Sequence, residues 1–244
     1  MLVAASVGLL AHVATYWATV ALTRSQGSCD ATLDNAIHVP QGMPRHVKDV
    51  APVVLRNQLA TVLLLPVAGW VIHRCRDGGG AYVRGAWDVS PDVQPYAALG
   101  LGVIEFVSLT EAYDIVFATL HYTVHKAPAV YKRVHALHHA MAFSLGAGAL
   151  YTTVTEHLLV NVGSLLIAAA LLGPHVAVLA AFVVIGTANT ILAHCPETAH
   201  ALHHRKHACN YGNWPYAWDR SFNTWEPPDG ELARRTWGIG RAHV

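Results

Sequence analysis

Histidine stands out in this sequence because it recurs at the spacing of one helical turn. The pattern appears three times, as one HxxxH pair and two HxxHH groups. Residues three and four apart lie on one face of a helix, so each group would present its rings together. Imidazole binds iron, zinc, copper and nickel, and the repeated pattern therefore predicts a metal site. The histidines are His121 and His125; His135, His138 and His139; and His200, His203 and His204.

These imidazoles outnumber the four ligands that one structural zinc ion takes, so they predict two metal ions with about four rings each. Zinc and iron both suit imidazole, and ligand chemistry does not choose between them. Two irons with open positions would activate dioxygen, while the protein supplies binding, orientation and exclusion of water. Asp114 lies two helical turns before His121. It is a candidate supporting residue that would accept the second ring N–H of a ligand histidine.

The composition is that of a membrane protein. Of 244 residues, 53% are hydrophobic and 13% are charged, against roughly 25% charged in a soluble domain. The net charge of +1 excludes a general nucleic-acid-binding surface. No GxGxxG follows a predicted strand, so the chain is not expected to bind NAD(P)H. The four cysteines form no CxxC pair, and we expect mostly reduced thiols.

Several apolar segments are long enough to cross a bilayer. Residues 2–23 contain no charged side chain and lack the basic start of a signal peptide, so we expect a retained helix. Further segments follow at about 53–73 and 96–125. Residues 157–196 also carry no charge, and Gly173-Pro174 divides them into two arms, which predicts a helical hairpin. A returning hairpin brings the second and third histidine groups to one side of the membrane.

The predicted fold is an all-α integral membrane bundle of about four to five membrane helices with a histidine-rich cap that holds two metals. Residues 1–95 would contain the N-terminal membrane helices and their connecting loops. Residues 96–244 would form the catalytic domain, including the hairpin and the C-terminal cap. Basic residues flank the histidine groups, which favours the cytoplasmic side for the cap.

The histidine motifs resemble those of the fatty acid hydroxylase and sterol desaturase superfamily of membrane di-iron oxidoreductases. The resemblance covers residues 111–224, almost half of the chain. It departs from the family at Ala118-Thr119, Tyr122, Thr153-Val154 and Asn223. The matching elements are Asp114 seven residues before His121, Tyr131-Lys132 before the second group, Glu156-His157, His194, Asn210-Tyr211-Gly212 and Trp218-Asp219.

The resemblance implies an O2-dependent enzyme of lipid or sterol biosynthesis that hydroxylates or desaturates a sterol or a long-chain acyl lipid. It implies two iron ions, with zinc able to take their place in purified protein. Electrons would come from cytochrome b5 or an NAD(P)H-dependent reductase, and the enzyme would lie in the endoplasmic reticulum with a cytosolic cap. The resemblance also adds His194 as a ninth metal ligand.

Other interpretations stay open at this point. His194-Cys195 with Glu197 is also similar to the aldehyde-processing, wax-alkane branch, and an acyl-desaturase relative would share the metal site. Outside the enzymes, the alternatives are a histidine-rich metal transporter and an inactive family member. His157 is placed between a ligand and a structural role, and His207 is expected to pack or to support a ligand.

Overall fold

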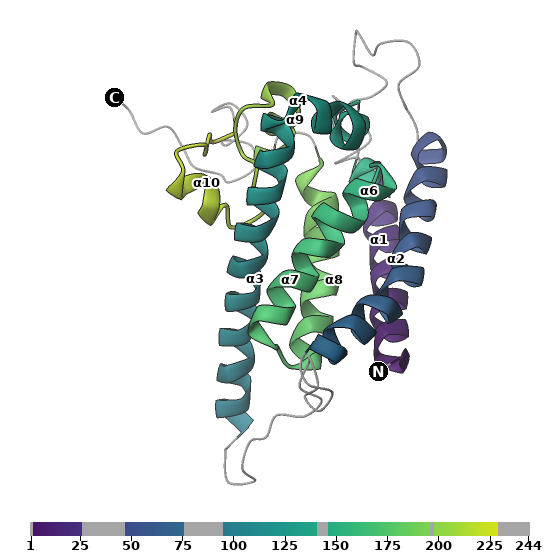
Figure 1. Ribbon diagram of the computed structural model, residues 1–244, viewed down its shortest axis with the longest axis vertical. Coiled ribbons are helices and arrows are strands. Elements are labelled where there is room, and N and C mark those ends of the chain that lie inside the picture. The colour runs from purple at the N-terminus through teal and green to yellow at the C-terminus, as the bar shows by residue number, and fades with distance from the viewer. Residues whose placement is uncertain (1, 26–46, 76–94, 141–145, 196–197, 229–244) are drawn as a thin grey trace.

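The computed structural model describes residues 2–25, 47–75, 95–140, 146–195 and 198–228. Every regular element in these ranges is helical, which confirms the all-α prediction. Five long helices run along the long axis of the molecule, and the short elements gather at one end (Figure 1). The predicted connections of the N-terminal part, within 26–46 and 76–94, lie outside the described residues.

The apolar segments of the sequence form the long helices. The predicted segments at 2–23, 53–73 and 96–125 appear as the first three of these, extended by a few polar residues. Thr198 caps the N-terminus of a shorter helix by accepting a hydrogen bond from the N–H of Ala201. The long helices are α1 (Leu2–Ser25), α2 (Val47–Cys75), α3 (Pro95–Lys126), α7 (Gly163–Leu172) and α8 (Val176–Ala193).

The predicted hairpin consists of two helical arms. The first runs through α6 (Val154–Glu156), the π-helical η3 (His157–Val162) and α7, and the second is α8. Gly173 ends α7 with a φ of 58°, in the left-handed region that glycine adopts without strain. Both arms are long and apolar enough to cross a membrane, and they are the two described helical segments that meet this criterion. The larger number of membrane helices stays a prediction.

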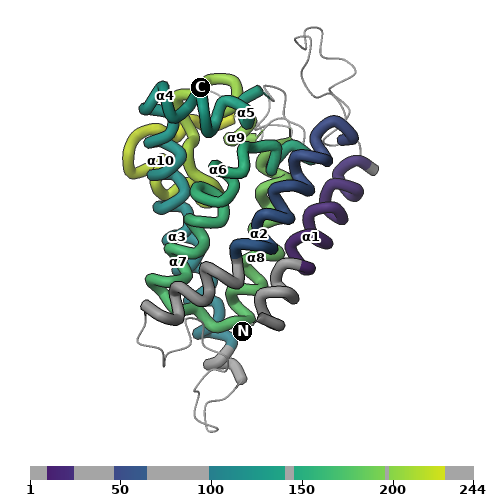
Figure 2. The backbone as a smooth tube through the Cα atoms, turned by 45° about the vertical axis from the view of Figure 1, so that its right-hand side comes forward, coloured from purple at the N-terminus to yellow at the C-terminus, as the bar shows by residue number. Residues whose placement is uncertain are grey.

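The short elements form a cap at the end of the bundle opposite the Gly173 turn. Figure 2 shows α4, α5 and α9 at the top of the bundle and α10 beside the upper part of α3. Their position matters because the histidine motifs lie on three of them, η1, α5 and α9, and on the last turns of α3. They are α4 (Pro128–Val130), the π-helical η1 (Tyr131–His135), α5 (Ala136–His139), the 3-10 turn η2 (Gly146–Gly148), α9 (Ala199–Lys206) and α10 (Ala217–Ser221).

Small side chains allow α3 to pack closely on the hairpin. Leu109 of α3 lies against Ala168 and Ala169 of α7, and all three are fully buried. A second apolar cluster joins Tyr16 of α1 and Ile191 of α8 to α2 and the η2 turn. Close packing through small residues is typical of helices in membranes, where dispersion contacts replace the hydrophobic driving force. The bundle therefore offers a rigid base for the cap.

Two cysteines differ in state. Cys195, directly after His194, is disulfide-bonded, which corrects the expectation of a reduced thiol at this position. Cys209 is free and buried.

Candidate metal centre

Nine histidines meet in the cap and divide into two groups, each with its ligand nitrogens within 4.8 Å of one another. They are the nine residues that the sequence and the resemblance pointed to. All are buried except His125, which is half-buried. Group A is His121, His125, His135, His139 and His203, and group B is His138, His194, His200 and His204.

The two HxxHH helices each supply rings to both groups. Neighbouring residues on a helix are about 100° apart, so the HH pair sends its two rings in different directions. Residues four apart lie on one face, so the first and last histidines of each motif stay together. In the first motif, His135 at the end of η1 and His139 of α5 belong to group A and His138 of α5 to group B; in α9, His200 and His204 belong to group B and His203 to group A.

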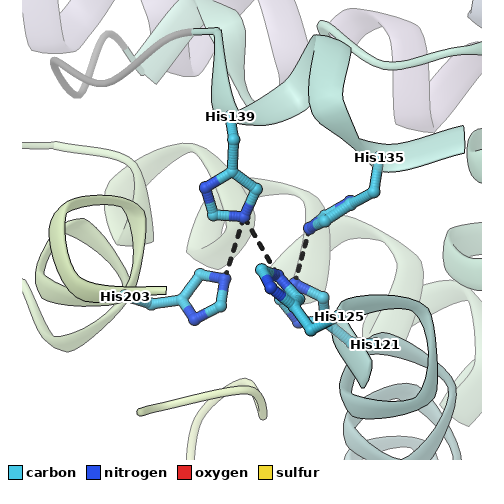
Figure 3. Close-up of side chains that lie close together, drawn as sticks. All are labelled: His121, His125, His135, His139 and His203. Carbon is cyan, nitrogen blue, oxygen red and sulfur yellow. Dashed lines mark hydrogen bonds between the residues drawn. The ribbon is translucent and has the colours of Figure 1, made fainter. Parts of the chain in front are cut away.

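The ring nitrogens of group A converge on one point (Figure 3). The Nε2 atoms of His121 and His135 are 2.9 Å apart, and Nε2 of His139 lies 3.1 Å from Nε2 of both His125 and His203. Two nitrogens bound to one metal at 2.0–2.1 Å are roughly 2.8–3.4 Å apart when their angle lies between about 90° and the tetrahedral value. The spacing therefore suits a single ion.

The other ring nitrogen of several histidines is held by a backbone carbonyl. Nδ1–H of His121 donates to the carbonyl oxygen of Tyr211 at 2.6 Å, and that of His203 donates to Cys209 at 2.7 Å. In group B, Nδ1–H of His194 donates to the carbonyl oxygen of Thr190 at 2.7 Å. A carbonyl only accepts, so the proton must lie on Nδ1 and the lone pair on Nε2.

A carboxylate holds the fourth such ring. Glu156 accepts from Nδ1–H of His135 at 2.8 Å, and both side chains are buried. Thr153 fixes the local backbone, because its hydroxyl donates to the carbonyl of Val134 and accepts from the N–H of Glu156. A carboxylate behind a ligand histidine orients the ring and makes it more basic.

The donor set fits a cation. With their protons on Nδ1, His121 and His135 point two lone pairs at each other across 2.9 Å. No proton lies between two such neutral rings, so the lone pairs repel unless a positive ion lies between them. Group B shows the same pattern: Nε2 of His138 lies 3.2 Å from Nε2 of His194, and Nε2 of His200 and both ring nitrogens of His204 are buried without partners. Buried polar atoms without partners commonly mark the place of an ion or water.

Burial keeps the rings in the form that binds metals. Desolvation, together with the neighbouring imidazoles, lowers the pKa of His139 to about 2. The same causes hold the pKa of His203 and of His204 well below the usual value. A metal ligand must be the neutral imidazole, and these rings are neutral at physiological pH.

Two further carboxylates hold the loop that carries the Tyr211 carbonyl. Asp219 accepts from the backbone N–H of Tyr211 and Gly212, at 2.8 and 2.6 Å. Asp114 accepts from the N–H of Asn213 at 2.7 Å and of Trp218 at 3.2 Å. The expected direct bond from a ligand histidine to Asp114 is therefore not what the structure shows. Asp114 acts one step away, through the loop whose carbonyl holds His121.

The two histidines of undecided role lie outside both groups. His157 belongs to neither metal group, and its Nε2 lies 2.7 Å from the hydroxyl of Thr61. His207 is exposed and directly follows α9, with its ring centroid 4.2 Å from that of His139.

The role of Glu156 was not predicted from the sequence, although the residue was part of the family pattern. Its signal is a charged residue at the start of an otherwise uncharged hairpin arm.

We predict that His138→Ala lowers the metal content of the purified protein from roughly two ions to roughly one, because group B would keep only three rings. His207→Ala should retain both ions, since this exposed ring lies outside the groups. Metal analysis of folded protein after iron supplementation measures both. Equal losses in the two variants would contradict the assignment of the groups.

Glu156→Ala should weaken metal binding at group A by about 10–100-fold, because His135 would lose the partner that fixes its ring. Glu156→Gln keeps an oxygen that accepts from His135 and should lose less. Competition with a chelator measures the affinity. Unchanged affinity in Glu156→Ala would show that the carboxylate does not support the site.

Gly212→Ala should destabilise the loop and weaken metal binding, because a Cβ there would lie 2.6 Å from a carboxylate oxygen of Asp114 and 2.8 Å from one of Asp219. Displacing them costs about 1–3 kcal/mol. Gly100→Ala is the matched control, with nothing within 4 Å of its Cβ. Thermal unfolding of the two variants compares them, and equal melting temperatures would refute the tight loop.

Comparison with known proteins agrees with this geometry. No curated protein and no solved structure matches the chain. The family model for fatty acid hydroxylase matches residues 106–224. The match includes every histidine of groups A and B, the three supporting carboxylates and the hairpin. The resemblance read from the motifs is confirmed over these residues: residues 106–224 match the fatty acid hydroxylase family.

Proposed function

We propose that this protein is a membrane-bound, di-iron, O2-dependent oxidoreductase that hydroxylates or desaturates a sterol or a long-chain acyl lipid. The observation that carries the proposal is the convergence of nine histidines into two groups, with the Nε2 lone pairs of His121 and His135 facing each other across 2.9 Å. The family is one of metal-dependent lipid hydroxylases, which supports a lipid as the substrate. Two groups of this size suit two ions, and iron adds the redox chemistry that zinc lacks.

The residues of this chain would hold two irons and control their surroundings. Group A and group B are the ligands, and the bound irons would supply the activation of dioxygen and the oxidation of a C–H bond. The carbonyls of Tyr211, Cys209 and Thr190 and the carboxylate of Glu156 keep the rings aligned. The rings are almost all buried, so the fold excludes water from the site. Electrons must come from outside, and we propose cytochrome b5 or an NAD(P)H-dependent reductase as their source.

Association with a membrane is supported by the outer faces of the helices. Large apolar side chains are exposed along several of them, including Leu55 of α2, Ile104 of α3 and Leu171 of α7. Exposed apolar surface on this scale marks contact with lipid or a partner. A transporter would distribute ligands along the membrane helices, whereas here they gather in the cap at one end. This placement favours the enzyme.

We propose that the cap lies on the cytoplasmic side of the endoplasmic reticulum membrane. Basic side chains flank the site and are exposed, which favours the cytoplasm; they are Lys126, Lys132, Arg133, Arg205, Lys206 and Arg220. The disulfide at Cys195 favours the opposite side, since disulfides persist in oxidising compartments. A cysteine introduced at Lys132 should react with an impermeant thiol reagent added to the cytoplasm. Reaction only from the lumen would place the cap in the oxidising compartment.

The function is tested by supplying the iron-loaded protein with a reductant, dioxygen and lipid mixtures of sterols and acyl lipids. Oxidised or desaturated products should appear with native protein and be absent with His138→Ala at matched protein levels. Mass spectrometry of the lipids identifies the product. Equal product from the two proteins would rule out the histidine centre as the catalyst.

A further inference from the structure

Helix α2 holds the segment that carries Glu156, and it does so on both sides of that residue. Asn57 contacts Thr152, four residues before Glu156, and Thr61 contacts His157, which directly follows Glu156. Asn57 and Thr61 are four residues apart, so they lie on one face of α2. Both are buried, with exposed fractions of 0% and 8%.

The first contact is made by the side-chain amide of Asn57. Its nitrogen donates to the carbonyl oxygens of Leu150 and Thr152, both at 3.0 Å, and to the hydroxyl of Thr152 at 3.1 Å. Its oxygen accepts from the guanidinium of Arg56, which also donates to the carbonyl of Thr152 at 2.9 Å. These partners fix the orientation of the amide, with the nitrogen toward the 150–152 loop. The amide depends on the loop as well, because a buried polar group without partners is costly.

The second contact is made by the hydroxyl of Thr61. It donates to the carbonyl of Asn57 at 3.2 Å and accepts from Nε2–H of His157 at 2.7 Å. The backbone N–H of His157 donates in turn to the carbonyl of Thr153 at 3.0 Å. The chain is therefore tied to α2 both before and after Glu156.

The tied segment leads to group A through two further hydrogen bonds. Thr153 follows Thr152, and its hydroxyl accepts from the N–H of Glu156 at 3.1 Å. One carboxylate oxygen of Glu156 accepts from Nδ1–H of His135 at 2.8 Å. The other is buried and has no hydrogen-bond partner in the part of the chain that the structure describes. The position of this carboxylate thus depends on the backbone that carries it.

We propose that Asn57 is a positioning residue of the metal centre, with Thr61 as its partner on α2. Asn57 fixes the segment that carries Glu156, and Glu156 orients the ligand His135. A residue that acts on a ligand through hydrogen bonds changes the metal affinity without touching the metal. Since α2 lies outside residues 106–224, the range that matches the family, the N-terminal part of this chain contributes to the metal centre as well.

A double-mutant cycle separates positioning from general stabilisation of the fold. Asn57→Ala and Glu156→Ala are made singly and together in the full-length protein. The affinity of each variant for Zn²⁺ is measured by competition with a chelator, and thermal unfolding is measured beside it. If Asn57 acts through Glu156, the two losses of affinity do not add. If it acts on the fold alone, Asn57→Ala has the same effect whether or not Glu156 is present.

We expect Asn57→Ala to weaken the binding of one of the two ions by about tenfold, the lower end of the range for residues that support a ligand. It should cause no further loss when Glu156→Ala is already present, because the carboxylate that Asn57 positions is then gone. Tyr16→Phe is the matched control. It removes a buried hydrogen bond of 2.8 Å to the carbonyl of Ala147, at the start of the same loop, and should bind both ions like the native protein.

Thr61→Val tests the same segment if Asn57→Ala does not fold. It keeps the branched shape of the side chain and removes the hydroxyl that holds His157. Its loss of affinity should also disappear when Glu156→Ala is present. Losses that add to that of Glu156→Ala would overturn the proposal, as would native affinity in both Asn57→Ala and Thr61→Val or an equal loss in Tyr16→Phe.

The inference rests on the proposed metal centre, and its assay needs neither dioxygen nor lipid. Native protein that binds no metal would refute the proposed function. Metal binding that does not depend on Asn57 or Thr61 would refute this inference and leave the proposed function in place.

Discussion

The rest of the structure depends on the opposition of nitrogen lone pairs at the centre of the cap. A buried imidazole has one proton, and the structure places that proton on Nδ1 of His121, His135, His203 and His194, where an oxygen accepts it. The Nε2 lone pairs are then directed inward at distances that suit shared ligation. Without a cation, this arrangement is repulsive; with one, the same geometry becomes a source of stability, because binding free energy is folding free energy when the unfolded chain has no site.

The support for these rings comes mostly from backbone rather than from side chains. Carbonyl oxygens hold three of the four rings, and the loop that carries one of them is in turn held by Asp114 and Asp219. The carboxylates therefore act in two ways. Glu156 contacts a ligand ring directly, whereas the two aspartates fix a chain segment that presents a carbonyl. Both arrangements place carboxyl groups close to the site, where they would help to offset the charge of a bound metal.

Much of this architecture could be predicted from the sequence. The features that could not be predicted have identifiable physical reasons. Helical spacing and family motifs pointed to all nine histidines, and the Gly173-Pro174 break located the hairpin turn. The division of the histidines into groups A and B could not be predicted from the sequence, because it depends on how α5 and α9 face each other after the π-helical turn of η1. The role of Asp114 was misread, since its partners are backbone N–H groups about a hundred residues further along the chain. Main-chain acceptors such as Tyr211 leave no signature in residue type.

The alternation of rings between the two groups makes the cap intolerant of changes in length. In the two HxxHH segments, a histidine's angle around the helix axis decides which group it joins, and one residue corresponds to about 100°. A single inserted or deleted residue would turn every later ring out of its own group, although no histidine would be lost. Natural variation in chain length should therefore be confined to the connections outside the two HxxHH segments.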